Sequence, residues 1–136
     1  MLELAAVGRS DVVYDLGCGD GRIVIAAARR GARGVCVEID RMRIAEARRN
    51  ARQAGVEDQI EFYVDDLFEH PIGGATAVML FLNAETHLRL RPKLLKELRP
   101  ATRIVTHMHR IGDWPPAKTV KVPGPLRDHP IFLWIR

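Results

Sequence analysis

The chain has 136 residues, of which 47% are hydrophobic and 28% are charged, and its formal net charge is +4. This length predicts one domain with a single core, and this composition excludes a disordered chain. We expect neither a membrane span nor a secretory signal, because no apolar run reaches roughly 18 residues and the first residues lack a basic leader.

Strands and helices are predicted to alternate from the start of the chain. An apolar run that ends in glycines predicts a buried strand over residues 11–16, followed by a helix over residues 21–31. A second buried strand is predicted at residues 34–38. Asp40 then suits the N-cap of a helix that ends near Ala54. This alternation is typical of α/β proteins with a parallel sheet.

Three further strands are predicted in the middle of the chain, at residues 60–64, 75–82 and 103–107. Pro92 is well placed as the first residue of a short helix between the last two of them, because proline suits that position. The side chains that this helix is expected to bury are those of Leu94, Leu95 and Leu98.

Five prolines after residue 114 exclude long helices from the end of the chain. Two strands fit between these prolines, at residues 119–122 and 131–135. We expect them to form an antiparallel pair at the edge of the sheet.

The most informative segment is Asp15–Gly21, a glycine loop between the first strand and the first helix. Its glycines are spaced G-x-G-x-G, which lets the backbone turn tightly and approach a ligand. The following helix points its free N–H groups at the same place, so the loop suits a carboxylate or a nucleotide. Dinucleotide sites usually have G-x-G-x-x-G, and a Walker loop needs a Lys-Ser or Lys-Thr pair that is absent here.

Acidic residues at successive strand ends favour one ligand. Glu38 ends the second strand and can accept both ribose hydroxyls of a nucleoside. Asp65 or Asp66, at the end of the third strand, can accept a hydrogen bond from an adenine amino group. Asp15 and Asp20 lie in the loop itself, where a diphosphate would meet too many carboxylates. S-adenosylmethionine has no phosphate and offers an ammonium and a sulfonium, so we predict it as the cofactor.

These motifs resemble those of class I S-adenosylmethionine-dependent methyltransferases. Within that superfamily the chain is similar to the short archaeal, bacterial and mitochondrial protein-lysine methyltransferases. The resemblance implies an α/β fold, a Rossmann-like, mostly parallel seven-stranded sheet with an antiparallel C-terminal edge and helices on both faces. The matching segments are Asp15–Gly21, Val37–Asp40, Val64–Phe68, Leu90–Pro100, Arg103–Val105 and Ile111–Pro115.

The resemblance also implies roles for residues in the cofactor site. Asp15, Gly17 and Gly19 would contact the methionine part, and Glu38 would hold the ribose. Ile39 would pack on adenine. Asp66, with Asp65 as the alternative, would read the adenine amino group. The full set expected to bind the cofactor is Asp15, Gly17, Cys18, Gly19, Asp20, Gly21, Glu38, Ile39, Asp65, Asp66 and Leu67.

The predicted reaction transfers a methyl group to an amine, which the resemblance implies is a protein lysine. Asn83, Glu85 and His107 are the residues predicted to form the acceptor pocket. The Asn83 side chain, the Glu85 carboxylate or strand-end carbonyls are expected to orient the amine and help it lose its proton. The segment 83–85 lacks the prolines and the aromatic residue of enzymes that methylate bases, so we do not expect a nucleic acid partner. We expect no metal site. A small-molecule methyltransferase and a cofactor-binding module without activity remain alternatives.

The segments that depart from the family lie at the start of the chain and after the fifth strand. Relatives carry an upstream segment that helps close the cofactor site, so we expect either an earlier natural start or a more open site. Relatives also tend to have Ser-His-Asp-Phe where this chain has Thr106–His109.

Charge and cysteine content lead to expectations about partner and location. Residues 1–70 carry ten Lys and Arg against thirteen Asp and Glu, a net charge of −3, and residues 71–136 carry a net charge of +7. We therefore expect the second half to meet a protein substrate with an acidic surface around its lysine. Cys18 and Cys36 are predicted to be reduced thiols of a cytoplasmic protein.

Overall fold

The computed structural model describes residues 1–136, which form three α-helices and seven strands. In chain order these are β1 (Val12–Leu16), α1 (Arg22–Arg29), β2 (Arg33–Glu38), α2 (Arg41–Gln53), a 3₁₀ turn η1 (Glu57–Gln59), β3 (Ile60–Val64), β4 (Ala77–Leu80), α3 (Ala84–Glu97), β5 (Arg103–His107), β6 (Lys118–Val122) and β7 (His129–Ile135). No helix combines the length and the hydrophobicity that crossing a membrane requires.

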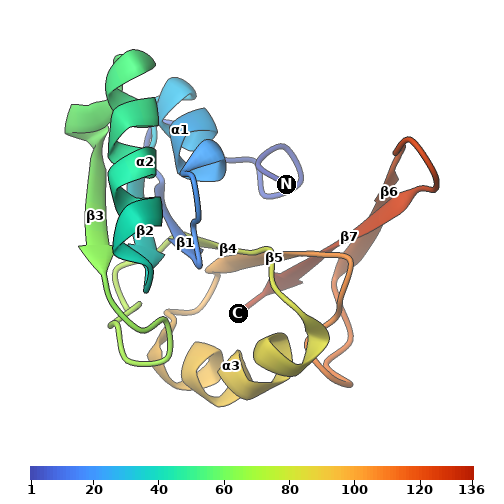
Figure 1. The fold of residues 1–136 in the computed structure, drawn as a ribbon. Helices are drawn as coiled ribbons and strands as arrows, with labels where there is room; N and C mark the ends of the chain where they lie inside the picture. The colour runs from blue at the N-terminus through green and yellow to red at the C-terminus, as the bar shows by residue number, and fades with distance from the viewer.

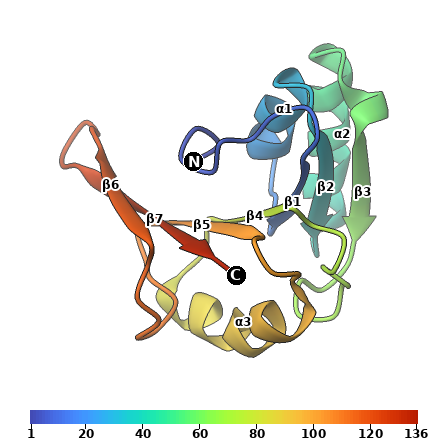
Figure 2. The ribbon, with the colours of Figure 1, turned by 180° about the vertical axis from the view of Figure 1, so that it is seen from behind.

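All seven strands pair in one sheet, in the order β3-β2-β1-β4-β5-β7-β6. Strands β1 to β5 pair in parallel, and β7 pairs antiparallel with both β5 and β6. Figures 1 and 2 show that α1 and α2 cover one face of the sheet and that α3 covers the other. The predicted fold class is therefore confirmed.

The central pair of strands, β1 and β4, creates a crevice at the carboxyl end of the sheet. After β1 the chain continues into α1 on one face, and after β4 it continues into α3 on the other (Figure 1). Open α/β sheets bind their ligands where neighbouring strands diverge in this way. Asp15 of β1 pairs with Met79 of β4 directly beside this point.

The two helices on the first face begin in different ways. No side chain caps α1, which starts after Gly21 with its φ of 84°. A Cβ at Gly21 would lie 3.0 Å from the Cβ of Ala47, so the loop and α2 are closely packed. α2 begins as predicted, because the Asp40 carboxylate accepts a hydrogen bond of 2.9 Å from the Met42 amide.

The prediction that Pro92 begins the helix between β4 and β5 is wrong. α3 begins at Ala84, eight residues earlier, where the Asn83 side chain accepts a hydrogen bond of 2.8 Å from the Thr86 amide. Pro92 lies inside the helix. Leu95, which we expected to be buried, is 37% exposed.

His87 explains why the start of α3 is hidden in the sequence. It lies on the same buried face as Leu90 and Leu94, but a polar residue interrupts the apolar spacing there. The chain nevertheless satisfies both ring nitrogens. Nε2 accepts a hydrogen bond of 3.2 Å from the Leu82 amide, and Nδ1 lies 3.0 Å from the His109 carbonyl oxygen.

The antiparallel edge formed by β6 and β7 is confirmed. β7 lies between β5 and β6, and three of its seven residues are buried. β6 is exposed at every residue and includes Lys118 and Lys121. Lysines on an edge strand discourage pairing with another chain.

A buried ion pair ties the segment before β1 to β5. Asp11 is 7% exposed and accepts hydrogen bonds from the Gly8 amide at 2.8 Å and the Thr76 hydroxyl at 2.7 Å. The Arg103 guanidinium pairs with the same carboxylate and donates to the Ala5 carbonyl at 2.7 Å. Burial acts to raise the pKa of Asp11, but these hydrogen bonds and Arg103 together hold the pKa below its usual range. The folded chain therefore depends on a charged Asp11.

We expect Arg103→Met to lower the free energy of unfolding by about 3 kcal/mol, because it leaves a buried carboxylate without its cation. The loss should shrink as the pH falls through about 4, since a protonated Asp11 needs no cation. Urea denaturation measures both effects, and Arg99→Met, at an exposed position, is the matched control. Equal unfolding free energies for the two variants would contradict this account.

Candidate functional site

A cavity of about 900 Å³ includes in its lining the glycine loop at the carboxyl end of β1. Its lining comes from the glycine loop after β1, from α1 and residues 1–3, and from the ends of β4 to β7. The structure brings six of the predicted site residues together in this lining. They are Asp15, Gly17, Cys18, Gly19, Asp20 and His107.

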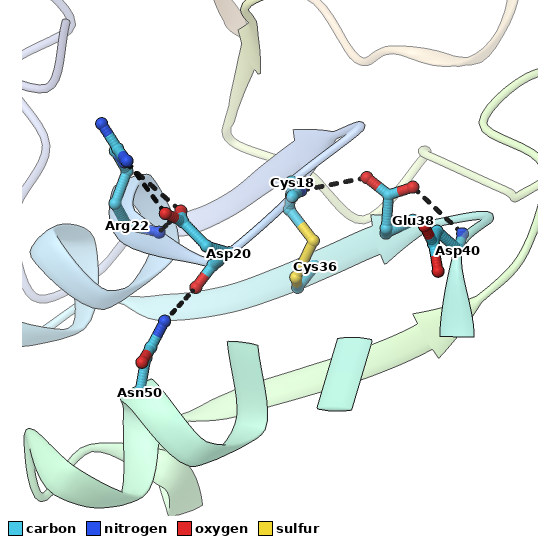
Figure 3. Close-up of a disulfide and its surroundings, with 8 residues drawn as sticks. Cys18, Asp20, Arg22, Cys36, Glu38, Asp40 and Asn50 are labelled. Carbon is cyan, nitrogen blue, oxygen red and sulfur yellow. Dashed lines mark hydrogen bonds and ion pairs between the residues drawn. A yellow bond between two sulfur atoms is a disulfide. The ribbon is translucent and has the colours of Figure 1, made fainter. Parts of the chain in front are cut away.

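The glycine loop is held against β2 by its own backbone. The amides of Gly17 and Cys18 both donate to the Val37 carbonyl oxygen, at 2.8 and 3.1 Å. The next amide, that of Gly19, donates to Glu38 Oε1 at 3.1 Å (Figure 3). Three successive amides therefore bind two successive residues at the end of β2.

Gly17 occupies the crevice between β1 and β4. Its φ is 84°, and a Cβ at this position would lie 2.9 Å from the Leu82 side chain and 3.8 Å from that of Leu67. Both the backbone conformation and the space therefore require glycine here.

The prediction of two reduced thiols is wrong, because Cys18 and Cys36 form a disulfide and the chain has no free cysteine (Figure 3). Their Cα atoms lie 5.3 Å apart, which is within the range of disulfides. The loop returns over β2 after Gly17, and this return places Cys18 beside a strand residue 18 positions further along the chain. Sequence spacing alone does not reveal such a contact.

Asp15 is a buried ionisable residue near the carboxyl end of β1. It is 2% exposed, and its Oδ1 has no hydrogen-bond partner. Burial, followed by the charges of Glu38 and Asp20, raises the pKa of Asp15 to about 7. A buried carboxylate of this kind favours a cationic ligand, which the chain itself does not supply. The ammonium group of S-adenosylmethionine fits this site.

Glu38, at the end of β2, uses both carboxylate oxygens on backbone amides. Oε1 accepts from Gly19 and Oε2 accepts from Asp40, each at 3.1 Å (Figure 3). Each carboxylate oxygen can accept a second hydrogen bond, so Glu38 can still bind ribose hydroxyls. It lies outside the cavity lining, at the next strand end.

Asp20 has its partners on the first two helices. Its carboxylate pairs with Arg22 at 2.9 Å, and this hydrogen bond holds the pKa of Asp20 below its usual range. Its carbonyl oxygen accepts a hydrogen bond of 2.9 Å from the Asn50 side chain on α2 (Figure 3). Sequence reasoning missed Asn50, because a single asparagine in a helix has no local signal for a distant carbonyl.

The two aspartates after β3 differ in how many of their carboxylate oxygens already have a hydrogen-bond partner. Asp65 accepts from the Asp66 amide with one oxygen and lies 2.8 Å from the His70 ring with the other. Asp66 is exposed and uses only Oδ1, which accepts from the Phe68 amide at 2.8 Å. Asp66 is therefore the freer acceptor, which agrees with the preference for it over Asp65.

Two apolar residues flank these carboxylates. Ile39, next to Glu38, is 68% exposed, so its side chain is free to pack against a planar ring. Leu67 lies beside Gly17 at the crevice. The Asp65 amide donates to the Glu38 carbonyl oxygen at 3.1 Å and joins the two strand ends. The predicted residues of β2 and β3 thus lie next to each other, outside the cavity lining.

Two aromatic rings, those of Phe81 and His107, also belong to the cavity lining. The ring of Phe81, which follows β4, stacks on that of His107 with a centroid distance of 3.9 Å and an interplanar angle of 8°. His107 Nε2 lies 3.1 Å from Nδ1 of His129 on β7. Burial, followed by the charges of His129 and His109, lowers the pKa of His107, so this imidazole is neutral at pH 7. Phe81 and His129 are contacts that sequence reasoning missed.

The other two residues predicted for the acceptor pocket do not line the cavity. Asn83 uses its side chain as the N-cap of α3, and Glu85 is exposed in the first turn of that helix. Sequence reasoning grouped them with His107 because Asn83 and Glu85 follow the predicted fourth strand and His107 ends the fifth. Both residues lie at the start of α3, which covers the opposite face of the sheet from α1 (Figure 1).

The charged residues of the cavity lining differ from the expectation that the basic second half faces the acceptor. No Lys or Arg of residues 71–136 lines the cavity. On α3, Arg89 stacks on the Phe68 ring at 4.3 Å, and Arg91 pairs with Asp113. The net charge of a sequence segment sums residues that lie on both faces of the sheet, so it does not show where a charged surface patch lies. The four arginines that line the cavity are Arg22, Arg29, Arg30 and Arg43.

Comparison with known proteins identifies the class. The family model of the ANTKMT methyltransferase domain matches residues 15–118. A protein-lysine N-methyltransferase of Saccharolobus islandicus is 42% identical over 99% of this chain and 85% of its own length. The adenine nucleotide translocase lysine N-methyltransferase of Mus musculus is 32% identical over 83% of this chain, which spans only 50% of that relative. The chain belongs to the ANTKMT methyltransferase family, and the predicted class of S-adenosylmethionine-dependent methyltransferases is confirmed.

A solved structure matches almost the whole fold. It is an RNA methyltransferase from Salinibacter ruber in complex with S-adenosyl-L-homocysteine. The TM-score is 0.94 at 48% sequence identity, and the match covers 98% of this chain and 86% of the other. This neighbour and the lysine methyltransferases differ in the acceptor that their names give.

We expect the affinity for S-adenosylhomocysteine to fall about 20-fold between pH 7.5 and pH 5.5, because an ionised Asp15 must meet the ammonium group. Below its pKa of about 7 Asp15 is protonated, so binding must first release a proton. Titration calorimetry at a series of pH values measures the profile, and a flat profile would contradict this role.

Asp15→Asn should bind weakly and without this pH dependence, whereas Asp58→Asn, which removes an exposed carboxylate, should keep the parent profile. The raised pKa also means that ionised Asp15 destabilises the free fold progressively from about pH 4 to pH 7. Above pH 7 Asp15→Asn should therefore be more stable than the parent in urea denaturation.

We expect Glu38→Ala to weaken binding of S-adenosylhomocysteine by roughly 1–3 kcal/mol, the usual cost of losing a charged hydrogen-bond partner. The overall fold should persist, since Glu38 lies at a strand end. Calorimetry measures the affinity, and Glu61→Ala on neighbouring β3 is the matched exposed control. Unchanged affinity would mean that Glu38 serves only to hold the amides of Gly19 and Asp40.

Proposed function

We propose that this chain transfers a methyl group from S-adenosylmethionine to the side-chain amine of a protein lysine. The observation that carries the proposal is one cavity whose lining joins two unlike groups of residues. Asp15 is buried and its Oδ1 has no partner, whereas Phe81 and His107 form a stacked aromatic pair. The carboxylate suits a cationic cofactor, and the aromatic pair suits an alkyl chain that carries an amine.

Residues at the ends of β1, β2 and β3 each bind a different part of the cofactor. Asp15 faces its ammonium group, and the backbone of Gly17 to Gly19 accommodates its methionine part. Glu38 accepts from the ribose hydroxyls, and Asp66 accepts from the adenine amino group. Ile39 packs on the adenine ring. When bound, the cofactor supplies a methyl group on a sulfonium for in-line displacement by a nucleophile.

The part of the cavity lined by Phe81 and His107 must present a neutral amine in line with that methyl group. Positioning and removal of water therefore dominate the reaction. Phe81 and Ile131 offer an apolar surface to the lysine side chain. His107, neutral through its lowered pKa, accepts a hydrogen bond from the amine and helps it lose its proton. Asn83 and Glu85 lie outside this cavity and are weaker candidates for that role.

A protein acceptor is favoured over RNA by the family model and by relatives named as lysine methyltransferases. The chain around residue 83 also lacks the motif of enzymes that methylate bases. RNA is the second candidate, because the neighbour at 48% identity bears the name of an RNA methyltransferase. A small-molecule acceptor and a module without activity are further possible outcomes of a labelling experiment.

The surface around the cavity supports an acidic segment in the substrate. Arg29 and Arg30 at the end of α1 and Arg43 on α2 belong to its lining together with Arg22. These cations attract carboxylates that flank the target lysine, and the attraction weakens as salt increases. This patch replaces the second half of the chain as the proposed docking surface.

A cytoplasmic location remains our prediction. Its argument from two free thiols no longer holds, because Cys18 and Cys36 form a disulfide and disulfides are rare in most cytosolic proteins. That the whole chain forms one methyltransferase domain also remains our proposal.

Incubation of the chain with an extract and methyl-labelled S-adenosylmethionine tests the acceptor. We expect label in protein, recovered as methyl-lysine by mass spectrometry, and little label with Asp15→Asn. Label confined to RNA or to small molecules would overturn the lysine assignment. Cofactor binding without any labelled product would favour a module without activity.

On a labelled protein substrate, we expect Arg29→Glu to raise KM about fivefold at low salt, because the change reverses one charge near the substrate path. The matched control is Arg89→Glu on α3, which should leave KM near its parent value. Affinity for S-adenosylhomocysteine should be unchanged in both variants. Equal KM values for the two variants would mean that the arginines around the cavity do not guide the substrate.

A further inference from the structure

The disulfide joins the two segments on which the cofactor loop depends. Cys18 lies between Gly17 and Gly19 in the loop and is 5% exposed, and Cys36 lies in β2 and is fully buried. The bond therefore links the centre of the loop to the strand that ends in Glu38 (Figure 3).

Without the disulfide, hydrogen bonds alone would hold the loop on β2. These are the amides of Gly17 and Cys18 on the Val37 carbonyl and the amide of Gly19 on Glu38. Gly17 and Gly19 have φ values of 84° and 56°, in a region that glycine enters and leaves easily. A covalent bond in the middle of this segment removes most of that freedom, because it fixes the residue between the two glycines.

We propose that the Cys18–Cys36 disulfide is a redox-controlled brace, which holds the glycine loop in its cofactor-binding shape when oxidised and lets it loosen when reduced. This inference rests on the proposed cofactor site at the loop. The oxidised chain binds the cofactor more tightly, because less loop freedom is lost on binding.

The exchange chemistry starts at Cys18. Cys18 is 5% exposed and Cys36 is fully buried, so an external thiolate attacks the Cys18 sulfur when the loop opens locally. Its attack forms a mixed disulfide and releases the Cys36 thiolate. A second thiolate of the reductant then attacks the mixed disulfide and releases Cys18, so two electrons and two protons pass to the protein. In the reverse direction, a low-molecular-weight disulfide such as oxidised glutathione takes them up.

Two consequences follow for the bound cofactor. It holds the glycine loop closed over the buried disulfide, so it should shield the disulfide from attack. Linkage also requires that the cofactor stabilise the oxidised form by the same factor by which oxidation tightens binding. A tenfold difference in affinity corresponds to a shift of about 30 mV in the reduction potential.

The test uses the full chain equilibrated with oxidised glutathione or with an excess of dithiothreitol. Alkylation and mass spectrometry count the free thiols, and the count is unambiguous because the chain has only two cysteines. Calorimetry with S-adenosylhomocysteine should give about tenfold tighter binding to the oxidised chain. Saturating S-adenosylhomocysteine should slow reduction by dithiothreitol at least severalfold.

The control is Cys36→Ala, which removes the disulfide at a buried residue of β2 outside the cofactor-binding set and should have one affinity under both conditions. Affinities within twofold of each other for the oxidised and reduced parent would overturn the brace while leaving the proposed cofactor site intact. Two alkylated thiols after treatment with oxidised glutathione would also overturn it. Failure to bind S-adenosylhomocysteine in either state would overturn the cofactor site and the brace together.

Discussion

The buried carboxylate of Asp15 is the constraint on which the arrangement of the site depends. β1 lies between two parallel neighbours near the centre of the sheet, so its last residues lie among apolar side chains. Burial raises the pKa of Asp15 to about 7, and one oxygen remains without a partner. The chain offers no cation to this carboxylate, but the cavity gives a ligand access to it. A cationic ligand therefore binds by relieving an unfavourable state that the fold imposes.

The rest of the cofactor site is organised by β2. The loop after β1 returns over this strand, and its amides bind Val37 and Glu38. Glu38 therefore has two tasks under the proposed function, because the same carboxylate holds the loop and accepts from the ribose. The brace at Cys18 acts on the same contact. Cofactor affinity consequently depends on how well the loop is ordered, and cofactor binding in turn orders the loop.

The sequence allowed most of the fold and half of the site to be predicted, because those features have local signals. Apolar runs mark the strands, and glycines mark the loop and the ends of the first two helices. The start of α3 has no such signal. His87 can be buried there only because its ring nitrogens have hydrogen-bond partners at Leu82 and His109, and both partners lie outside the helix. The pairing of Cys18 with Cys36 depends likewise on the path of the loop, which residue spacing does not record.

The same distinction separates the proposed cofactor residues from the proposed acceptor residues. The predicted cofactor residues lie at the ends of β1 to β3 in short motifs, which relatives can share. The proposed acceptor residues are Phe81 after β4, His107 on β5 and His129 on β7, which no single motif joins. Few substitutions at these separate positions can change the acceptor while the fold and the cofactor site persist. Neighbours of 42% and 48% identity can therefore bear the names of a lysine and an RNA methyltransferase on one scaffold. Under the proposed function, the acceptor of this chain is accordingly set by the contacts of His107 with Phe81 and His129.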